Sequence, residues 1–183
     1  MTDMGVLRAI KDTEVELMRA WRNAPGVRLN MYTRHEISRE EHLSWWAGVQ
    51  SREDQQYFMY CNQDVPTGIV AFTGIDLIGQ NSSWAFYASP DAAKGTGTKM
   101  EFLAIDYAFS GLMLHKLYCE VLAYNRPVIK LHQKFGFKIE GVFREHHKID
   151  EAFVDIYRFG LLGAEWTALR PQMAARLNSF LRG

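Results

Sequence analysis

The chain has 183 residues, 48% of them hydrophobic, and its 21 Lys and Arg residues balance 21 Asp and Glu residues. This length and apolar content fit one domain over residues 1–183 with a substantial core. Zero net charge excludes a general attraction to nucleic acid or to an anionic membrane, and no segment reaches the ~20 apolar residues that span a bilayer. We therefore expect a soluble, cytoplasmic protein whose two cysteines are reduced.

Hydrophobic periodicity and turn residues predict a mixed α/β domain. The first half of the chain is expected to contain a strand at 6–10, helices at 13–22 and 38–50, and strands at 57–61, 67–75 and 84–88. The second half is expected to contain a helix ending near 112, a strand at 117–124, a short helix ending at 136, and strands at 138–146 and 152–161. The last expected element is a helix at 163–181, which Pro171 kinks or splits. Asp12 or Thr13 is the expected N-cap of the first helix, and Ser38 with Glu41 forms a capping box for the second. The strand–helix–strand unit over 84–124 predicts one parallel strand pair.

The most informative stretch of the chain is Lys94-Gly95-Thr96-Gly97-Thr98, which lies between a strand and an amphipathic helix. A glycine-rich turn that enters a helix exposes backbone N–H groups, and no Cβ atoms obstruct an approaching ligand. The helix dipole adds positive potential at the same point. These features predict a site for a pyrophosphate or another compact anion.

A second motif follows the strand that ends at Asn125, where a short helix closes with Phe135-Gly136-Phe137. With the turn that begins at Ala92, this block resembles the GNAT superfamily of acetyl-CoA-dependent N-acetyltransferases across essentially the whole chain. The resemblance implies a twisted, mixed, mostly antiparallel sheet flanked by helices. Its parallel strands, at 84–88 and 116–124, are expected to splay apart where acetyl-CoA, the co-substrate, binds.

The N-terminal half narrows the resemblance to one branch of the superfamily. This branch acetylates the 4-amino group of UDP-4-amino-4,6-dideoxy-N-acetyl-altrosamine, on the route to pseudaminic acid. The stretches that resemble it are Trp21-Arg22-Asn23, Met31-Tyr32-Thr33, Ile37-Ser38, Glu41-His42, Tyr57-Phe58 and His115 to Val121. The resemblance implies direct attack of a UDP-linked amino sugar on acetyl-CoA in a ternary complex, without an acetyl-enzyme.

The same resemblance assigns the cofactor contacts. They are expected from N–H groups near Tyr87 and Ala88, from the turn residues Lys94, Gly95, Thr96, Gly97 and Thr98, and from Asn125 and Lys130. A plain strand-to-helix cap is the alternative role of Asn125. Ala92 stands where the superfamily usually has Arg or Gln, so one side-chain contact to phosphate is missing and Lys94 is expected to compensate.

Two titratable residues are candidates for proton transfer. His132 occupies the position where many members carry the Tyr that protonates the departing thiolate, and imidazolium, with a pKa near ~6.5, can protonate a thiolate whose acid has a pKa near ~8.5. The alternative is that His132 is a partly exposed helix residue and that water is the acid.

Glu120 is the carboxylate of a central strand expected to be covered on both faces. It either accepts a proton from the sugar ammonium, directly or through water, or forms an ion pair with Lys116 or an Arg elsewhere.

Planar and hydrogen-bonding residues between the first two helices predict the sugar-nucleotide site. An Arg can bind a diphosphate bidentately, and an aromatic ring can stack on uracil. The candidates are Arg22, Asn23, Arg28, Tyr32, Thr33 and His42, with Phe72, Thr73 and Trp84 lining the acceptor side.

Several other features have a simpler interpretation. His146 and His147 are adjacent in a strand and point to opposite faces, so we expect no metal site. Cys61 and Cys119 are expected to be inaccessible core residues rather than nucleophiles. Trp45-Trp46 predicts either a homodimer contact or packing in the chain's own core. The competing functions are acetylation of a protein N-terminus, such as that of a ribosomal protein, and a catalytically silent domain that binds CoA.

Overall fold

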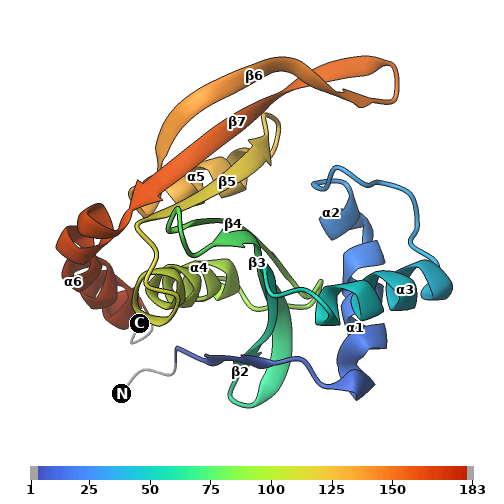
Figure 1. The fold of residues 1–183 in the computed structure, drawn as a ribbon, viewed down its shortest axis with the longest axis horizontal. Helices are drawn as coiled ribbons and strands as arrows, with labels where there is room; N and C mark the ends of the chain where they lie inside the picture. The colour runs from blue at the N-terminus through green and yellow to red at the C-terminus, as the bar shows by residue number, and fades with distance from the viewer. Residues whose placement is uncertain (1–3, 181–183) are drawn as a thin grey trace.

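A twisted seven-stranded sheet organises residues 4–180, the part of the chain that this computed structural model describes (Figure 1). The strands lie in the order β1-β2-β3-β4-β5-β7-β6. Their bounds are β1 Val6–Ala9, β2 Gln55–Asn62, β3 Val65–Asp76, β4 Asn81–Ala88, β5 Lys116–Leu122, β6 Lys138–Ile149 and β7 Ala152–Leu162. Neighbouring strands are antiparallel except β4 and β5, which are parallel. The predicted mixed sheet with one parallel pair is confirmed.

Helices cover the sheet in two groups, with α1, α2 and α3 well separated from α4 and α6 (Figure 1). The helices are η1 Asp12–Glu14, α1 Val15–Asn23, α2 Pro25–Arg28, α3 Arg39–Gln50, α4 Thr96–Asp106, the π-helical turn η2 Tyr107–Gly111, α5 Arg126–Lys134 and α6 Gly163–Phe180. The hydrophobic core includes Trp84 and Phe159 of the sheet, Met100 of α4, Phe135 directly after α5, and Trp166 of α6. Among the described helices, none is long and apolar enough to cross a membrane.

The structure corrects three local expectations. The first helix is preceded by a 3₁₀ turn and has Glu14 as its N-cap, without a side-chain cap from Asp12 or Thr13. The irregular segment before residue 37 contains the short helix α2, in which Pro25 occupies the first turn as proline prefers. Helix α6 continues through Pro171 rather than splitting; its predicted last residue, Leu181, lies outside the described residues. The Ser38 cap is confirmed, since its Oγ accepts a hydrogen bond from the Glu41 N–H at 3.1 Å.

The feature that positions the site is the short pairing between β4 and β5. Their parallel register runs from Asn81–Lys116 only as far as Ser83–Tyr118. Beyond this point β4 continues to Ala88 along β3, while β5 continues to Leu122 along β7. The facing edges of the two strands are therefore free of each other, as the resemblance implied. Each unpaired edge presents backbone N–H and C=O groups that a ligand can satisfy.

Candidate active site

A cavity of about 460 Å³ opens between the C-terminal ends of β4 and β5; we call it the wedge cavity. The residues that line it are Ala24, Gly26, Val27, Asn30, Met31, Trp84 to Pro90, Cys119, Glu120, Val121, Asn125, Val128 and His132. The wall is mostly apolar, with a few polar side chains, which is the usual composition of a small-molecule site. Six residues proposed from the sequence meet here: Tyr87, Ala88, Trp84, Glu120, Asn125 and His132.

Asn125 begins α5, but its side chain forms no capping hydrogen bond. The backbone alone makes the turn, since the Asn125 N–H donates to the Leu122 carbonyl at 2.8 Å. Asn125 is part of the wall of the wedge cavity. The structure therefore does not support the simple role of a helix cap, and the amide is free to contact a ligand.

The glycine turn adopts the conformation that its sequence requires. Gly95 is the N-cap of α4 with a φ of 93°, a left-handed value that residues with a Cβ rarely adopt. At Gly97 a Cβ would lie 3.3 Å from a ring carbon of Phe86, so glycine allows α4 to pack closely on β4. The N–H groups of Gly95 and Gly97 have no hydrogen-bond partner within residues 4–180, whereas that of Thr96 donates to the Ala93 carbonyl. Thr96 is buried and its hydroxyl also donates to Ala93, so its side chain is not available to a ligand.

Basic residues gather on the other side of this turn. A cavity of about 280 Å³, the basic cavity, is lined by Lys94, Gly95, Thr98, Lys134, Met173, Arg176 and Leu177. Its three cationic side chains face no acidic residue of the lining. This composition suits phosphate groups. Lys94 and Thr98, two of the predicted cofactor contacts, line this cavity. Lys130 is exposed on α5 and lines neither the wedge cavity nor the basic cavity.

His132 is buried, with 3% of its side chain exposed, and is not the partly exposed residue of the simpler interpretation. Its Nδ1 lies 2.8 Å from Oε1 of Glu101, which comes from α4 and is itself fully buried. Burial lowers the pKa of His132, but the Glu101 carboxylate and the Cys119 thiol together outweigh this effect and raise the pKa to about 10. Burial raises the pKa of Glu101. No motif in the sequence distinguishes Glu101 from the other polar residues of its helix.

Glu120 has a partner on each carboxylate oxygen. Arg158 of β7 donates to Oε1 at 2.9 Å, and the Tyr32 hydroxyl donates to Oε2 at 3.0 Å. Lys116 pairs with Glu140 instead. Of the residues that line the wedge cavity, Glu120 is the acidic one. Its strand is not covered on both faces as expected, because the side chain of Glu120 is 31% exposed while Cys119 and Val121 are buried.

A second cavity of about 340 Å³, the side cavity, adjoins the wedge cavity and shares Met31, Ala85, Phe86 and Tyr87 with it. Its other lining residues are Arg22, Thr33, Ile37, Glu41, His42, Trp45, Tyr57, Ile69, Ala71 and Thr73. Of the proposed acceptor residues, Arg22, Thr33, His42 and Thr73 lie here. The two cavities share four wall residues and therefore lie next to each other.

Arg22 is the cation of the side cavity. Its Nη2 donates to the Thr33 carbonyl at 2.9 Å, whereas its Nη1 is buried without a hydrogen-bond partner in the described chain. Burial lowers the pKa of Arg22, and no carboxylate among the described residues forms an ion pair with it. A buried guanidinium nitrogen without a hydrogen-bond partner is costly. An anionic ligand group would remove this cost.

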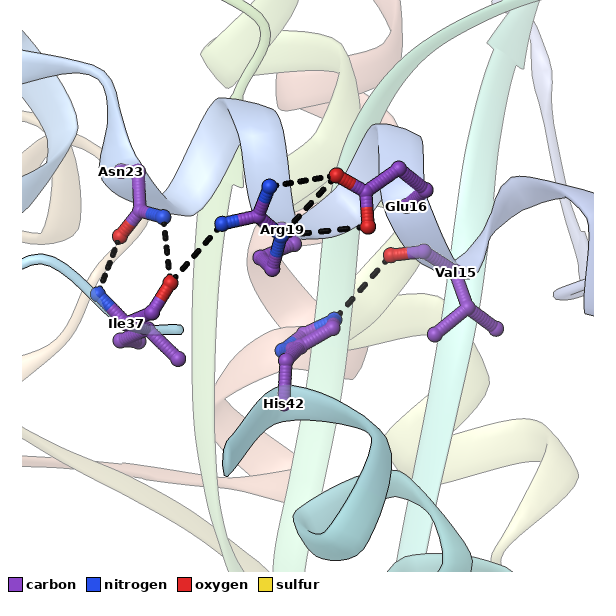
Figure 2. A network of polar contacts seen from close by, with 6 residues as sticks. All are labelled: Val15, Glu16, Arg19, Asn23, Ile37 and His42. Carbon is purple, nitrogen blue, oxygen red and sulfur yellow. Dashed lines mark hydrogen bonds and ion pairs between the residues drawn. The ribbon is translucent and has the colours of Figure 1, made fainter. Parts of the chain in front are cut away.

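His42 and Asn23 have structural partners, as Figure 2 shows. The Nε2 of His42 lies 3.1 Å from the Val15 carbonyl, and burial lowers the pKa of this imidazole. The amide of Asn23 forms two hydrogen bonds with the backbone of Ile37, one in each direction (Figure 2). Asn23 lines neither the wedge nor the side cavity, so its predicted ligand role is replaced by a role in holding Ile37.

Three other acceptor candidates also lie outside both cavities. Arg28 ends α2 and contributes to neither lining. Phe72 is fully buried in the core against Phe58 and Tyr107. Tyr32 is 45% exposed and holds Glu120 rather than a ligand. Phe72 is therefore used for packing and Tyr32 for an internal hydrogen bond.

Trp45 and Tyr57 are site residues that the sequence reasoning did not assign. The Trp45 ring stacks on His42 with centroids 5.1 Å apart and meets the Tyr57 ring edge-on at 5.2 Å. The sequence contained an indication for Trp45, because His42 and Trp45 are three residues apart and so share a helix face. Trp46 packs instead into the small core cluster with Met18 and Met59.

The cysteines are buried and free. Cys119 also lines the wedge cavity, contrary to the expected inaccessible position. No group of three metal-ligating side chains occurs within residues 4–180.

Comparison with known proteins agrees with this geometry. The family described as Acetyltransferase (GNAT) domain matches residues 7–157. Acetyltransferase PseH of Campylobacter jejuni, serotype O:23/36, is 30% identical over 130 residues, which cover 71% of this chain and 80% of that protein. Spermidine N(1)-acetyltransferase of Escherichia coli K12 is 25% identical over 121 residues, 66% of this chain and 64% of that protein. The structure of spermidine N-acetyltransferase from Vibrio cholerae with CoA and spermine superposes with a TM-score of 0.83 at 22% identity, over 88% of this chain and 97% of that one.

Proposed function

Since the chain belongs to the GNAT acetyltransferase family and is an N-acetyltransferase that uses acetyl-CoA, we propose that its acceptor is a UDP-linked 4-amino-4,6-dideoxy sugar. The sugar's 4-amino group attacks the thioester directly in a ternary complex. The observation that carries this proposal is the unpaired guanidinium of Arg22 in the cavity that adjoins the thioester site. The branch resemblance and the similarity to Acetyltransferase PseH support the same substrate class.

The cofactor is assigned to the wedge and basic cavities. The pantetheine chain would lie between β4 and β5 and bond to their free edges and to Asn125. The diphosphate would accept hydrogen bonds from the N–H groups of Gly95 and Gly97, at the positive end of the α4 dipole. Lys94, Lys134 and Arg176 in the basic cavity would neutralise its remaining charge.

The acceptor is assigned to the side cavity. The Arg22 guanidinium would bind the diphosphate of the sugar nucleotide, and the exposed face of Trp45 would stack on the uracil. Apolar residues such as Ile69 and Ala71 suit the 6-deoxy methyl group. Glu120, at the boundary with the thioester, is placed to receive the ammonium proton through water once Tyr32 moves aside.

A polyamine is the second candidate, because structural neighbours are named as spermidine acetyltransferases. A polyamine carries several positive charges and requires carboxylates around it. Glu41 is the acidic residue in the side-cavity lining, and it is bonded to His35 at 3.0 Å. The partly buried cation Arg22 opposes a polycation in the same space, so the charges favour the sugar nucleotide.

The test is thiol release from acetyl-CoA with three acceptors: a UDP-4-amino-4,6-dideoxy sugar, spermidine and a peptide with a free N-terminus. The proposal expects kcat/KM for the sugar nucleotide to exceed the other two by at least about 100-fold. A higher kcat/KM for spermidine or the peptide would overturn it. Tight CoA binding without thiol release for any amine would instead favour a silent CoA-binding domain.

Two surfaces of the chain are candidates for the basis of a homodimer: the Trp45-Trp46 pair and an exposed strand. Because Trp45 lines the side cavity and Trp46 packs into the chain's own core, these residues offer little surface to a second copy. The exposed edge strand β6 is the other basis for a homodimer.

A further inference from the structure

A buried acid–base pair adjoins the wedge cavity, and the histidine of the pair is part of the cavity wall. Glu101 of α4 and His132 of α5 are 0% and 3% exposed, and they meet through a 2.8 Å contact between Oε1 and Nδ1. The second oxygen of Glu101, Oε2, has no hydrogen-bond partner in the described part of the chain. Burying such a pair costs several kcal/mol of desolvation, and apolar residues of the same size would pack with less cost. Its presence beside a ligand cavity therefore calls for a functional reason.

We propose that Glu101 is the positioning residue for the acid of the reaction: it holds Nδ1 of His132, so that Nε2 donates the proton to the departing CoA thiolate. This inference rests on the proposed function, because it requires acetyl transfer from CoA in the wedge cavity. Glu101 thereby gives His132 a hydrogen-bond partner, which the tyrosine that is usual at this position does not need.

The ring of His132 is fixed on all sides. Aromatic rings of Trp84, Phe86, Phe137 and Phe159 surround it at centroid distances between 5.2 and 6.3 Å. The titratable and charged groups that act on the pair are the Cys119 thiol, from β5, and Lys134, from the end of α5. Since four rings and the contacts with Glu101 and Cys119 define the orientation, the imidazole does not need to reorganise during the reaction.

The Glu101–His132 pair has two protonation states without net charge, and Nε2 carries a proton in both. As an ion pair, the imidazolium carries protons on both nitrogens; as an uncharged pair, Glu101 donates to Nδ1 and the remaining ring proton is on Nε2. Burial raises the pKa of Glu101, and the Glu101 carboxylate raises that of His132, so both shifts retain these protons as the pH rises. A histidine alone would lose its acidic proton above pH ~6.5.

The proton transfer conserves atoms and charge. The amine nitrogen forms a bond to the thioester carbon, the carbon–sulfur bond breaks, and sulfur takes the electron pair. The Nε2 proton passes to sulfur, which leaves the pair with one negative charge and one proton between Nδ1 and Oε1. The new amide nitrogen releases its extra proton to water, and the pair regains a proton from solvent after CoASH leaves.

The kinetic test compares E101Q with E101D. E101Q keeps the shape but removes the charge, so kcat should fall at least tenfold near pH 8 and recover partly below pH ~6.5, where His132 alone becomes protonated. E101D retains the charge and should keep the wild-type pH profile at a lower kcat. In E101Q/H132Q the loss should not exceed that of H132Q, because the two residues act as one unit. An E101Q enzyme within twofold of wild type, with an unchanged pH profile, would overturn the inference.

A second readout does not depend on the acceptor. In ¹⁵N-histidine-labelled protein saturated with CoA, the Nε2 of His132 should stay protonated from about pH 6 to about pH 9 in the wild type and titrate near its ordinary value in E101Q. A wild-type Nε2 without a proton at pH 7.5 would overturn the inference even if the enzyme is active. Failure of the proposed acceptor shows separately, as absence of wild-type thiol release with the sugar nucleotide.

Discussion

The wedge cavity lies between two strands of the sheet, whereas the side cavity is lined in part by a segment that crosses from one helix to the next. This crossing segment, residues 29–38, joins α2 to α3. Partly exposed contacts hold it: the Tyr124 hydroxyl donates to the Leu29 carbonyl at 2.6 Å, Tyr32 donates to Glu120, and Arg34 pairs with Asp150 near the tip of the β6–β7 hairpin.

The difference in construction matches a difference in role: the wedge cavity is assigned to the cofactor and the side cavity to the acceptor. Backbone edges and the buried His132 form the wedge cavity, and the glycine turn borders the basic cavity. Together they suit a cofactor that many enzymes share. Side chains and a segment between two helices form the side cavity, where single changes can alter the acceptor without affecting the core. We therefore expect substitutions around the wedge cavity to have larger effects than those around the side cavity.

Gly97→Val, at the glycine turn beside the wedge cavity, should have the largest effect. The new side chain would press on Phe86, from which even a Cβ is only 3.3 Å away, and would displace the start of α4. Overpacking of this kind costs about 1–3 kcal/mol, and a loss of ~2 kcal/mol in binding weakens the Kd for CoA about 30-fold. Isothermal titration and thermal unfolding measure both effects. Gly48→Val is the matched control, because Gly48 lies in α3 with open space around it; equal losses in both variants would contradict the packing argument.

Arg22→Gln should weaken the acceptor but not the cofactor. Loss of a charge-assisted contact costs about 1.5 kcal/mol or more, so the KM for the sugar nucleotide should rise about tenfold while that for acetyl-CoA stays the same. Steady-state kinetics with each substrate varied in turn provide the measurement. Arg28→Gln, on a neighbouring residue that lines neither cavity, should leave both KM values unchanged. A rise in the KM for acetyl-CoA would contradict the assignment of Arg22 to the acceptor site.

Tyr32→Phe should have a smaller effect, confined to the crossing segment. The lost hydrogen bond to Glu120 is partly exposed, so ~0.5 kcal/mol is expected, or a two- to threefold rise in the acceptor KM. Tyr118→Phe serves as the control, since its hydroxyl has no hydrogen-bond partner in residues 4–180 and its ring lies beneath Arg158. A tenfold effect of Tyr32→Phe would mean that Tyr32 contacts the substrate itself.

The Arg8–Glu14 pair, remote from both cavities, should affect stability and not catalysis. Its two hydrogen bonds lower the pKa of Glu14 from the ordinary 4.5 to about 2. Because the folded-state pKa is depressed, the contribution is present above pH ~4.5 and is lost as the pH falls towards 2. Glu14→Gln should remove ~0.5–1 kcal/mol of stability at pH 7 and nothing near pH 2. Urea unfolding at both pH values measures this; an equal loss at both would contradict the linkage.

The sequence allowed the donor half of the site to be predicted more fully than the acceptor half. Local patterns specify the β4–α4–β5 unit, the Gly95-containing turn and the helix after Asn125, because glycine conformation and strand periodicity act over a few residues. Tertiary contacts determine the side cavity, so Trp45 was assigned to a surface or core role and Asn23 to a ligand role. Glu101 could not be recognised, since only the packing of α4 against α5 shows its partner His132.

The most direct test of the proposed cofactor site is a crystal structure of the protein with CoA bound. The pantetheine chain should lie between the free edges of β4 and β5, with the sulfur within about 4 Å of Nε2 of His132 and the diphosphate at Gly95 and Gly97. A β4–β5 pair that is hydrogen-bonded along its full length, or CoA bound at any other surface, would contradict this assignment.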